Sequence, residues 1–163
     1  MKRFLLWGLC AACVAFAGMQ LVPVSRTNPP SIAARVIDAH LDIAPPVRAL
    51  LNRSCHDCHS NDTRWPWYSY IAPASWMVTK DVEKARKVMN FSEWTDEAGG
   101  KLEKAVGLLM ASCTDVTVGR MPKPEYVMLH SQAALNKADV KDFCQWTAKE
   151  GGRLLALRKK RPR

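Results

Sequence analysis

The residues best suited to chemistry lie together in the sequence CHDCH at residues 55–59. Two cysteines separated by two residues and followed directly by a histidine are the attachment pattern of c-type haem. Each thiol can form a thioether with one porphyrin vinyl group, and the histidine that follows can bind the iron from beneath the ring. The sequence therefore predicts one haem c per chain, attached through Cys55 and Cys58, with His59 as the proximal iron ligand.

Other uses of this cysteine pair have less support. A thioredoxin-like redox site needs strand–helix units, and no strand-like alternation occurs. A structural zinc site needs a second pair of closely spaced ligands, whereas Cys113 and Cys144 lie far apart in the chain. A local disulfide between Cys55 and Cys58 is a third alternative. His56 occupies a variable position that faces away from the iron, so we expect a solvated side chain.

The sixth iron ligand is sought among the methionines and the other histidines. Met121 is favoured because it lies in a predicted loop before Pro122, whose fixed φ and missing N–H suit an extended segment against a ring face. Methionine opposite His59 would raise the reduction potential and favour electron transfer. His130 is the alternative ligand, and an open site is the third option. The remaining candidates are Met77, Met89, Met110, Met128 and His40. Of these, Met77, Met89 and Met110 lie on or beside predicted helices and are expected in the core.

The first residues are typical of an export signal. Lys2 and Arg3 precede an apolar stretch that runs to about residue 24. Roughly 20 apolar residues can span a bilayer, and basic residues before such a span stay in the cytoplasm. We favour a retained anchor over residues 4–24, since the stretch continues beyond the candidate cleavage site at Ala17. The alternative is a soluble periplasmic protein cleaved at Ala17. Both place residues 25–163 on the periplasmic side of the inner membrane, where disulfides persist.

Positive charge is concentrated at the two ends of the chain. The formal net charge is +9, and residues 1–3 and 153–163 supply nearly all of it. The central part is close to neutral and gives little electrostatic support to nucleic-acid binding. We expect residues 153–163 to form a solvated basic tail, with contact to anionic lipid as the alternative. The expected partners are periplasmic redox proteins and the inner membrane, not nucleic acid.

Helical periodicity predicts an all-α fold. Apolar residues recur at intervals of three and four in the segments 46–54, 73–88, 101–113 and about 131–152. Gly151 and Gly152 are predicted to end the last helix, and a glycine and two prolines exclude a long helix over residues 114–130. We expect an N-terminal apolar helix, a Pro-rich tether over residues 25–45, and a domain over residues 46–152 with about four short helices and long ordered loops.

The remaining cysteines and the side chains near the motif that could contact a haem lead to two further predictions. Cys113 and Cys144 lie on faces of the last two predicted helices, and cysteines left over in an oxidising compartment often pair, so we expect a disulfide between them. Aromatic residues near the haem motif suit packing on the apolar haem faces. Donors available to the haem propionates are Arg64, Trp65, Arg86 and Tyr126.

The residues around the motif are more specific than the motif itself. They are SNDTRWPWY at 60–68, IAPASW at 71–76, NFSEW at 90–94, and Met121-Pro122 with Tyr126 and His130. Together with the motif they resemble the bacterial haem-binding domain family of small, single-haem, cytochrome-c-like proteins, over about residues 20–147. The resemblance implies haem, export and usually an N-terminal membrane segment, but no particular reaction. The family usually has glycine where Ala85 precedes Arg86 here.

Single-electron transfer through a haem bound by His59 and Met121 is the favoured function, in a carrier rather than an enzyme, so no catalytic residue is assigned. The alternative is a haem-based sensor or a small peroxidase-like module with an open sixth site. Two-haem peroxidases need a second haem motif, whereas this chain has a single motif, at residues 55–59. A zinc- or disulfide-stabilised interaction domain without haem is the third hypothesis.

Overall fold

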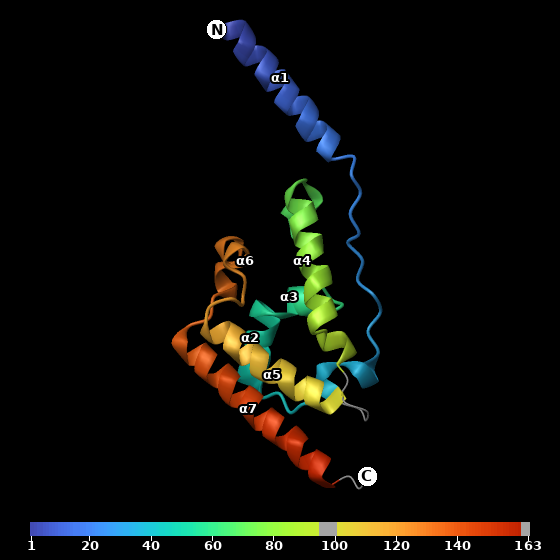
Figure 1. The fold of residues 1–163 in the computed structure, drawn as a ribbon, viewed down its shortest axis with the longest axis vertical. Coiled ribbons are helices and arrows are strands. Elements are labelled where there is room, and N and C mark those ends of the chain that lie inside the picture. The colour runs from blue at the N-terminus through green and yellow to red at the C-terminus, as the bar shows by residue number, and fades with distance from the viewer. Residues whose placement is uncertain (95–100, 161–163) are drawn as a thin grey trace.

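Helices form the regular structure of this chain, as the periodicity predicts. The computed structural model describes residues 1–94 and 101–160, and no strand occurs within them (Figure 1). The α-helices are α1 Lys2–Met19, α2 Pro45–Ser54, α3 His56–His59, α4 Ala74–Val88, α5 Lys101–Thr117, α6 Pro124–Leu129 and α7 Lys137–Lys160. Five 3-10 turns join them, η1 Ala33–Arg35, η2 Ile37–Ala39, η3 Trp67–Tyr70, η4 Phe91–Glu93 and η5 Ser131–Ala133. The expected all-α class is therefore confirmed.

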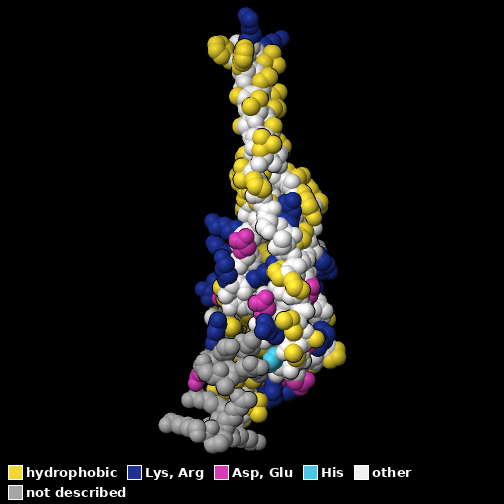
Figure 2. Space-filling view, turned by 90° about the vertical axis from the view of Figure 1, so that its right-hand side faces the viewer, with side chains coloured by type: hydrophobic (Ala, Val, Ile, Leu, Met, Phe, Trp, Pro, Cys, Tyr) yellow, Lys and Arg dark blue, Asp and Glu magenta, His cyan; other side chains and the backbone are white. Residues whose placement is uncertain are grey.

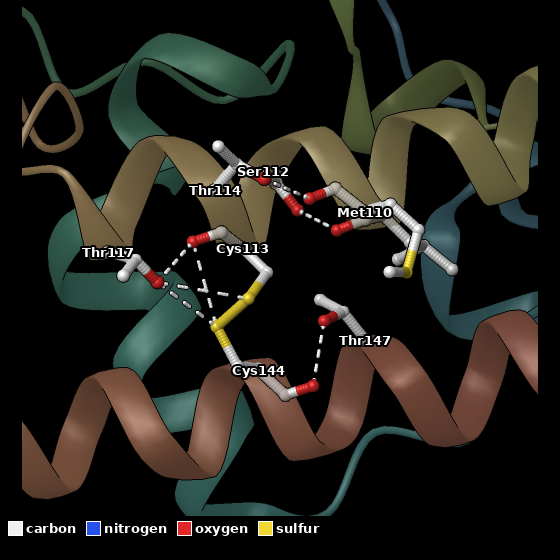
Figure 3. Close-up of a disulfide and its surroundings, with 8 residues drawn as sticks. Met110, Ser112, Cys113, Thr114, Thr117, Cys144 and Thr147 are labelled. Carbon is white, nitrogen blue, oxygen red and sulfur yellow. Dashed lines mark hydrogen bonds between the residues drawn. A yellow bond between two sulfur atoms is a disulfide. The ribbon is translucent and has the colours of Figure 1, made fainter.

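The core lies between α5, α7 and α2. Leu109 of α5 and Leu154 of α7 are fully buried, and Phe143 and Trp146 of α7 pack in the same cluster. Helices α5 and α7 run side by side (Figure 1). A disulfide between Cys113 and Cys144, with the two Cα atoms 5.0 Å apart, joins the second half of α5 to the first half of α7 (Figure 3).

The last helix continues through the glycine pair that was predicted to end it. Glu150 is fully buried, and its Oε2 accepts hydrogen bonds from Asp42 N (3.1 Å) and Arg153 Nε (2.8 Å). A Cβ added at Gly151 would lie 3.7 Å from Val106 Cγ1, an ordinary van der Waals distance, so α7 passes close to α5 at this residue. These contacts, with the buried Leu154, hold the helix past Gly152 and override the low helix propensity of glycine. The predicted end of the last helix at Gly151 and Gly152 is therefore wrong, and residues 153–160 belong to α7.

The second part of the segment predicted to be a tether belongs to the domain. Ile37, Leu41 and Ile43 are buried in the core cluster, so residues 37–45 pack rather than link. The apolar helix also ends at Met19 rather than near residue 24, since Pro23 follows and the chain turns toward the domain. No residue of α1 is buried, and the helix extends away from the domain (Figure 1).

Two other boundaries differ from the expectation. Helix α5 runs to Thr117, four residues beyond the predicted end, because Val116 is buried in the core. The segment after it contains the short α6, which begins at Pro124, a residue suited to a first helical turn. As predicted, no long helix crosses this part of the chain.

Candidate functional site

Helix α2 leads directly into the cysteine motif. Pro45 and Pro46 begin the helix, and Val47, Leu50 and Leu51 bury its inner face. The short α3 then contains His56–His59, with His59 N donating to Cys55 O at 3.0 Å. The anchored α2 therefore fixes where the two thiols and the imidazole lie.

The motif opens onto a large cavity of about 520 Å³. That volume lies within the range of cofactor sites, roughly 300–1,000 Å³. Side chains from α4, α5, α6 and the loop before α6 complete its wall, which is mainly apolar. Among the lining residues are Cys55, Cys58, His59, Val78, Val82, Phe91, Trp94, Leu108, Leu109 and Met121. The residues that chemistry singled out in the sequence thus share one cavity.

His59 is oriented by a backbone hydrogen bond. Its Nδ1 lies 2.9 Å from Met89 O, a carbonyl that can only accept, so Nδ1 carries the proton. Burial lowers the pKa of His59 and favours the neutral ring. The unprotonated Nε2 is then available to a metal. In many metal sites a backbone carbonyl sets the tautomer of the ligating histidine in this way, by accepting from its other ring nitrogen.

The two thiols of the motif are not joined in a disulfide, and burial raises the pKa of each. Burial, followed by the proximity of Cys58, raises the pKa of Cys55 to about 12. Burial, then Asp57 and Asp81, raises the pKa of Cys58 to about 11. Reactive thiolates of the thioredoxin type have lowered pKa values instead. Among the described residues, no group of three or more His, Cys, Asp or Glu side chains is placed to hold a metal ion.

A comparison with protein families agrees with this site. The family model described as "Haem-binding domain" matches residues 14–149. The chain belongs to the haem-binding domain family. No curated protein and no solved structure matched it. The family assignment makes haem the cofactor to test against the cavity.

The cavity of this haem-binding domain suits a haem. Its wall is mainly apolar, like the porphyrin faces, and it presents two thiols, an imidazole with a free Nε2 and thioether groups. Trp94 also lines it, and its buried Nε1 has no hydrogen-bond partner in the described part of the chain. A buried N–H normally has an acceptor, and a haem propionate would supply one. The residues present therefore fit the group.

The two predicted sixth ligands lie in different places. Met121 lines the cavity, whereas His130 is absent from its wall. The His130 ring stacks on Tyr126 with centroids 4.2 Å apart, and its Nδ1 lies 3.1 Å from Tyr126 O. Arg120 N and Met121 N both donate to Asp115 O, at 2.9 and 3.2 Å, which fixes the loop after α5.

Two other methionines differ from their predicted core positions, whereas Met89 packs against the core cluster as predicted. Met77 and Met110 are more than half exposed rather than buried. Met77 and the half-buried Met89 line the cavity. Met77 projects from α4 outside the hydrophobic cluster, so it is a further thioether at the site that apolar periodicity assigned to the core.

Arg86 of α4 holds the loop that follows the motif. Its Nε donates to Ser60 O at 2.7 Å, and its Nη2 donates to Thr63 Oγ1 at 2.9 Å. The same guanidinium donates to Thr27 O at 2.9 Å and to Asn28 Oδ1 at 3.1 Å. The arginine therefore binds this loop and the segment before the domain. It is a structural residue rather than the propionate donor considered from the sequence.

A second hydrogen-bond cluster ties this loop to the turn after α4. The nearly fully buried Asn61 donates from its backbone N to Ser92 Oγ at 2.9 Å. Asn90 Nδ2 donates to Asn61 Oδ1 at 2.8 Å, and Asn90 Oδ1 accepts from Ser92 N at 2.9 Å. Two of the sequence blocks that carry the family resemblance, 60–68 and 90–94, are thus in direct contact.

Asp57, inside the motif, was missed by sequence reasoning. Its carboxylate accepts hydrogen bonds from Arg64 Nε at 2.9 Å and from Tyr126 OH at 2.8 Å. Burial, and then the bond to Asp57, raises the pKa of Tyr126. Two predicted propionate donors are therefore already engaged by Asp57, and Trp65 Nε1 donates to Asn28 Oδ1 instead. The role of Asp57 as an acceptor for Tyr126 is visible only in the folded chain, since 69 residues separate the two in the sequence.

His56 is half-buried rather than solvated, because its Nδ1 lies 3.1 Å from Ser60 Oγ. The bond links the motif to the first residue of the following loop. His56 still does not appear among the residues lining the cavity.

Proposed function

We propose that this haem-binding domain is a c-type cytochrome that carries single electrons on the outer side of the inner membrane. One haem is attached through Cys55 and Cys58, with His59 as the proximal ligand. When bound, a c-type haem supplies a one-electron iron couple. The hydrogen bond from His59 Nδ1 to Met89 O carries the proposal, since it leaves Nε2 free for iron.

Met121 is the proposed sixth ligand. It lines the same cavity as His59, and the bonds to Asp115 O hold its loop. A methionine in this position raises the reduction potential, as suits an electron carrier. His130, engaged with Tyr126, is the less suitable candidate.

The proposed location rests on α1. One described helix, Lys2–Met19, is long and apolar enough to cross a membrane, and a cleaved signal sequence has the same features. We propose that it is retained as an anchor and that the domain meets redox partner proteins in the periplasm. A chain recovered as soluble periplasmic protein shortened at Ala17 would contradict the anchor.

The ligand assignment is tested by absorption spectra of the matured protein and of Met121→Ala. The parent should be six-coordinate and low-spin, with the weak charge-transfer band of methionine-bound ferric haem. Met121→Ala should lose that band, bind CO readily and show a reduction potential lower by on the order of 0.1 V, within the roughly 0.8 V range that axial ligands span.

Met77→Ala and His130→Ala are the matched controls and should keep the parent spectrum. If either control loses the band while Met121→Ala keeps it, the sixth ligand is reassigned. Rapid CO binding by the parent would instead favour the alternative function, a sensor or small peroxidase-like module with an open site.

A further inference from the structure

The end of α1 is bonded to the domain. Gln20, the first residue after the helix, donates from Nε2 to Ala72 O (3.3 Å) and accepts at Oε1 from Ala72 N (2.9 Å). Its Nε2 also donates to Phe16 O, in the last turn of α1, at 2.9 Å. One side chain thus links the exit of α1 to the loop that precedes α4. Figure 1 shows these two ends next to each other.

Two further residues hold the chain against the same loop. Arg26 Nη1 donates to Ser69 O at 3.1 Å, and its guanidinium carbon lies 4.3 Å from the centroid of the Tyr70 ring. Asn28 Nδ2 donates to Thr63 O at 2.9 Å. Residues 20–28 therefore run along the loop as a bound strap, and the position of the loop relative to α1 is fixed.

This end of the domain exposes large apolar and aromatic side chains. Trp67 is 74%, Tyr70 59% and Ile71 41% exposed. Leu21 and Val22 of the strap are also exposed. We call these five residues the η3 patch. In Figure 2, hydrophobic side chains cover α1 and recur on the end of the domain that adjoins it. Clustered exposed apolar groups of this kind indicate a contact surface.

The position of α1 identifies what the η3 patch contacts. Eighteen helical residues rise about 27 Å, close to the roughly 30 Å of a bilayer hydrocarbon core. If α1 spans the membrane, Gln20 lies at the outer interface, and its bonds to Ala72 bring the η3 patch to the same level. Tryptophan and tyrosine are enriched at that level, where an apolar ring and a polar edge are both accommodated.

We propose that the η3 patch inserts into the lipid headgroup layer, so that the domain is docked on the bilayer in a fixed orientation. This inference rests on the retained anchor of the proposed function. Pro66, Tyr68 and Met77 come from the same end of the domain and line the cavity. Docking therefore keeps the edge of the haem cavity at the membrane surface, within reach of membrane-bound redox partners.

Site-specific photo-crosslinking tests the docking. The full chain, matured with haem, is placed in phosphatidylethanolamine–phosphatidylglycerol vesicles with p-benzoylphenylalanine at position 67 or 71, and adducts are identified by mass spectrometry. The control position is Leu157, on α7 near the far end of the domain, which is 46% exposed. Lipid adducts should be at least tenfold more abundant at 67 and 71 than at 157. Equal yields, or adducts to a second copy of the chain instead of lipid, would overturn the proposal.

Gln20→Ala tests the link between α1 and the patch. It should lower the lipid adducts at position 71 several-fold while the chain stays in the membrane fraction and keeps its haem stain. The exposed Gln132→Ala is the control and should leave the yield unchanged. A chain that is membrane-bound and haem-stained but gives no lipid adducts contradicts the docking, and leaves the anchor and the haem assignment standing. A chain found in the soluble fraction contradicts the anchor together with docking, and an unstained chain contradicts the haem assignment.

Discussion

The two sides of the cavity are stabilised in different ways. On the side of α5 and α7, buried apolar side chains such as Leu109, Phe143 and Leu154 pack together, and the disulfide joins the two helices. Apolar contacts are non-directional and tolerate small displacements of the groups that make them. This side therefore contributes stability through packing, without setting the orientation of any one polar group.

On the side of α3 and α4, the residues next to the motif are polar and buried. Ser60 and Asn61 are almost fully inaccessible, and Arg86 binds the loop from α4. Hydrogen bonds are directional, so this side sets where His59 and the thiols point. The difference shows that stability and site geometry are supplied by separate parts of a small domain. Substitutions on the two sides should therefore have different effects.

Removing the disulfide with Cys113→Ser and Cys144→Ser should cost roughly 3.5 kcal/mol, from the entropy of a loop of this length. The bridge closes 31 residues of separation. Chemical denaturation of the haem-loaded protein measures the loss, and the visible spectrum should not change. Replacing the exposed Cys10 and Cys13 with serine is the control. A spectrum altered by loss of the bridge would contradict the separation of the two sides.

Leu154→Ala should lower the free energy of unfolding by about 3 kcal/mol, because it leaves a cavity in the core. The neighbouring Leu155→Ala, at a more exposed position, should cost well under half as much. Thermal and chemical unfolding compare the two variants. Equal, small effects would mean that α7 does not pack beyond Gly152.

Arg86→Leu should cost about 2 kcal/mol, because buried acceptors such as Ser60 O lose a charged donor. Unlike the substitutions in α7, it should also alter the visible spectrum, since the loop after the motif loses its support. Absorption spectra and chemical denaturation together give both readouts. Arg120→Leu, which removes only a largely exposed ion pair with Asp115, is the control and should do neither. An unchanged spectrum in Arg86→Leu would contradict the claim that the hydrogen bonds beside α3 and α4 set the orientation of His59 and the thiols.

Asp139→Asn should cost about 1 kcal/mol at neutral pH. Asn136 and Asp139 form a reciprocal cap at the start of α7, and Arg53 pairs with the carboxylate at 2.7 Å. The backbone bond from Asn136, then Arg53, lowers the pKa of Asp139. A carboxyl whose pKa is lowered by folding stabilises the folded state above its ordinary pKa of 3.8 and loses that effect as the pH falls through the folded value.

Denaturation at a series of pH values checks this prediction. The difference between Asp139→Asn and the parent should be constant near neutrality and should shrink below about pH 4. Asp142→Asn, at an exposed position on the same helix, is the control and should leave the free energy of unfolding at neutral pH nearly unchanged. A difference that grows as the pH falls would contradict the assigned sign.

The sequence predicts the apolar side well and the polar side poorly. Spacings of three and four locate α2, α4, α5 and α7, because amphipathic periodicity is a local property. The periodicity does not predict that α7 continues past Gly152, because Glu150 is held there by Asp42, which lies 108 residues away in the sequence. Propensity alone cannot register such a tertiary contact.

The candidate site divides in the same way. The motif locates its cysteines and His59 because their spacing is itself the chemical requirement. The acceptor role of Asp57 and the donor role of Trp94 escape detection, since an acceptor for Tyr126 and a donor at the cavity wall become visible only once α6 and η4 are placed around the cavity. The strap of residues 20–28 is missed for the same reason, as its bonds are to a loop more than 30 residues away.

Covalent attachment of haem at Cys55 and Cys58 is the central claim, and the intact mass of the matured chain tests it most directly, together with haem staining of a denaturing gel. The parent should gain the mass of one haem and stain after denaturation. The double variant Cys55→Ser and Cys58→Ser should gain no mass and lose the stain, while Cys10→Ser with Cys13→Ser should behave as the parent. An unmodified parent mass, or a stain that survives in the double variant, would contradict the account.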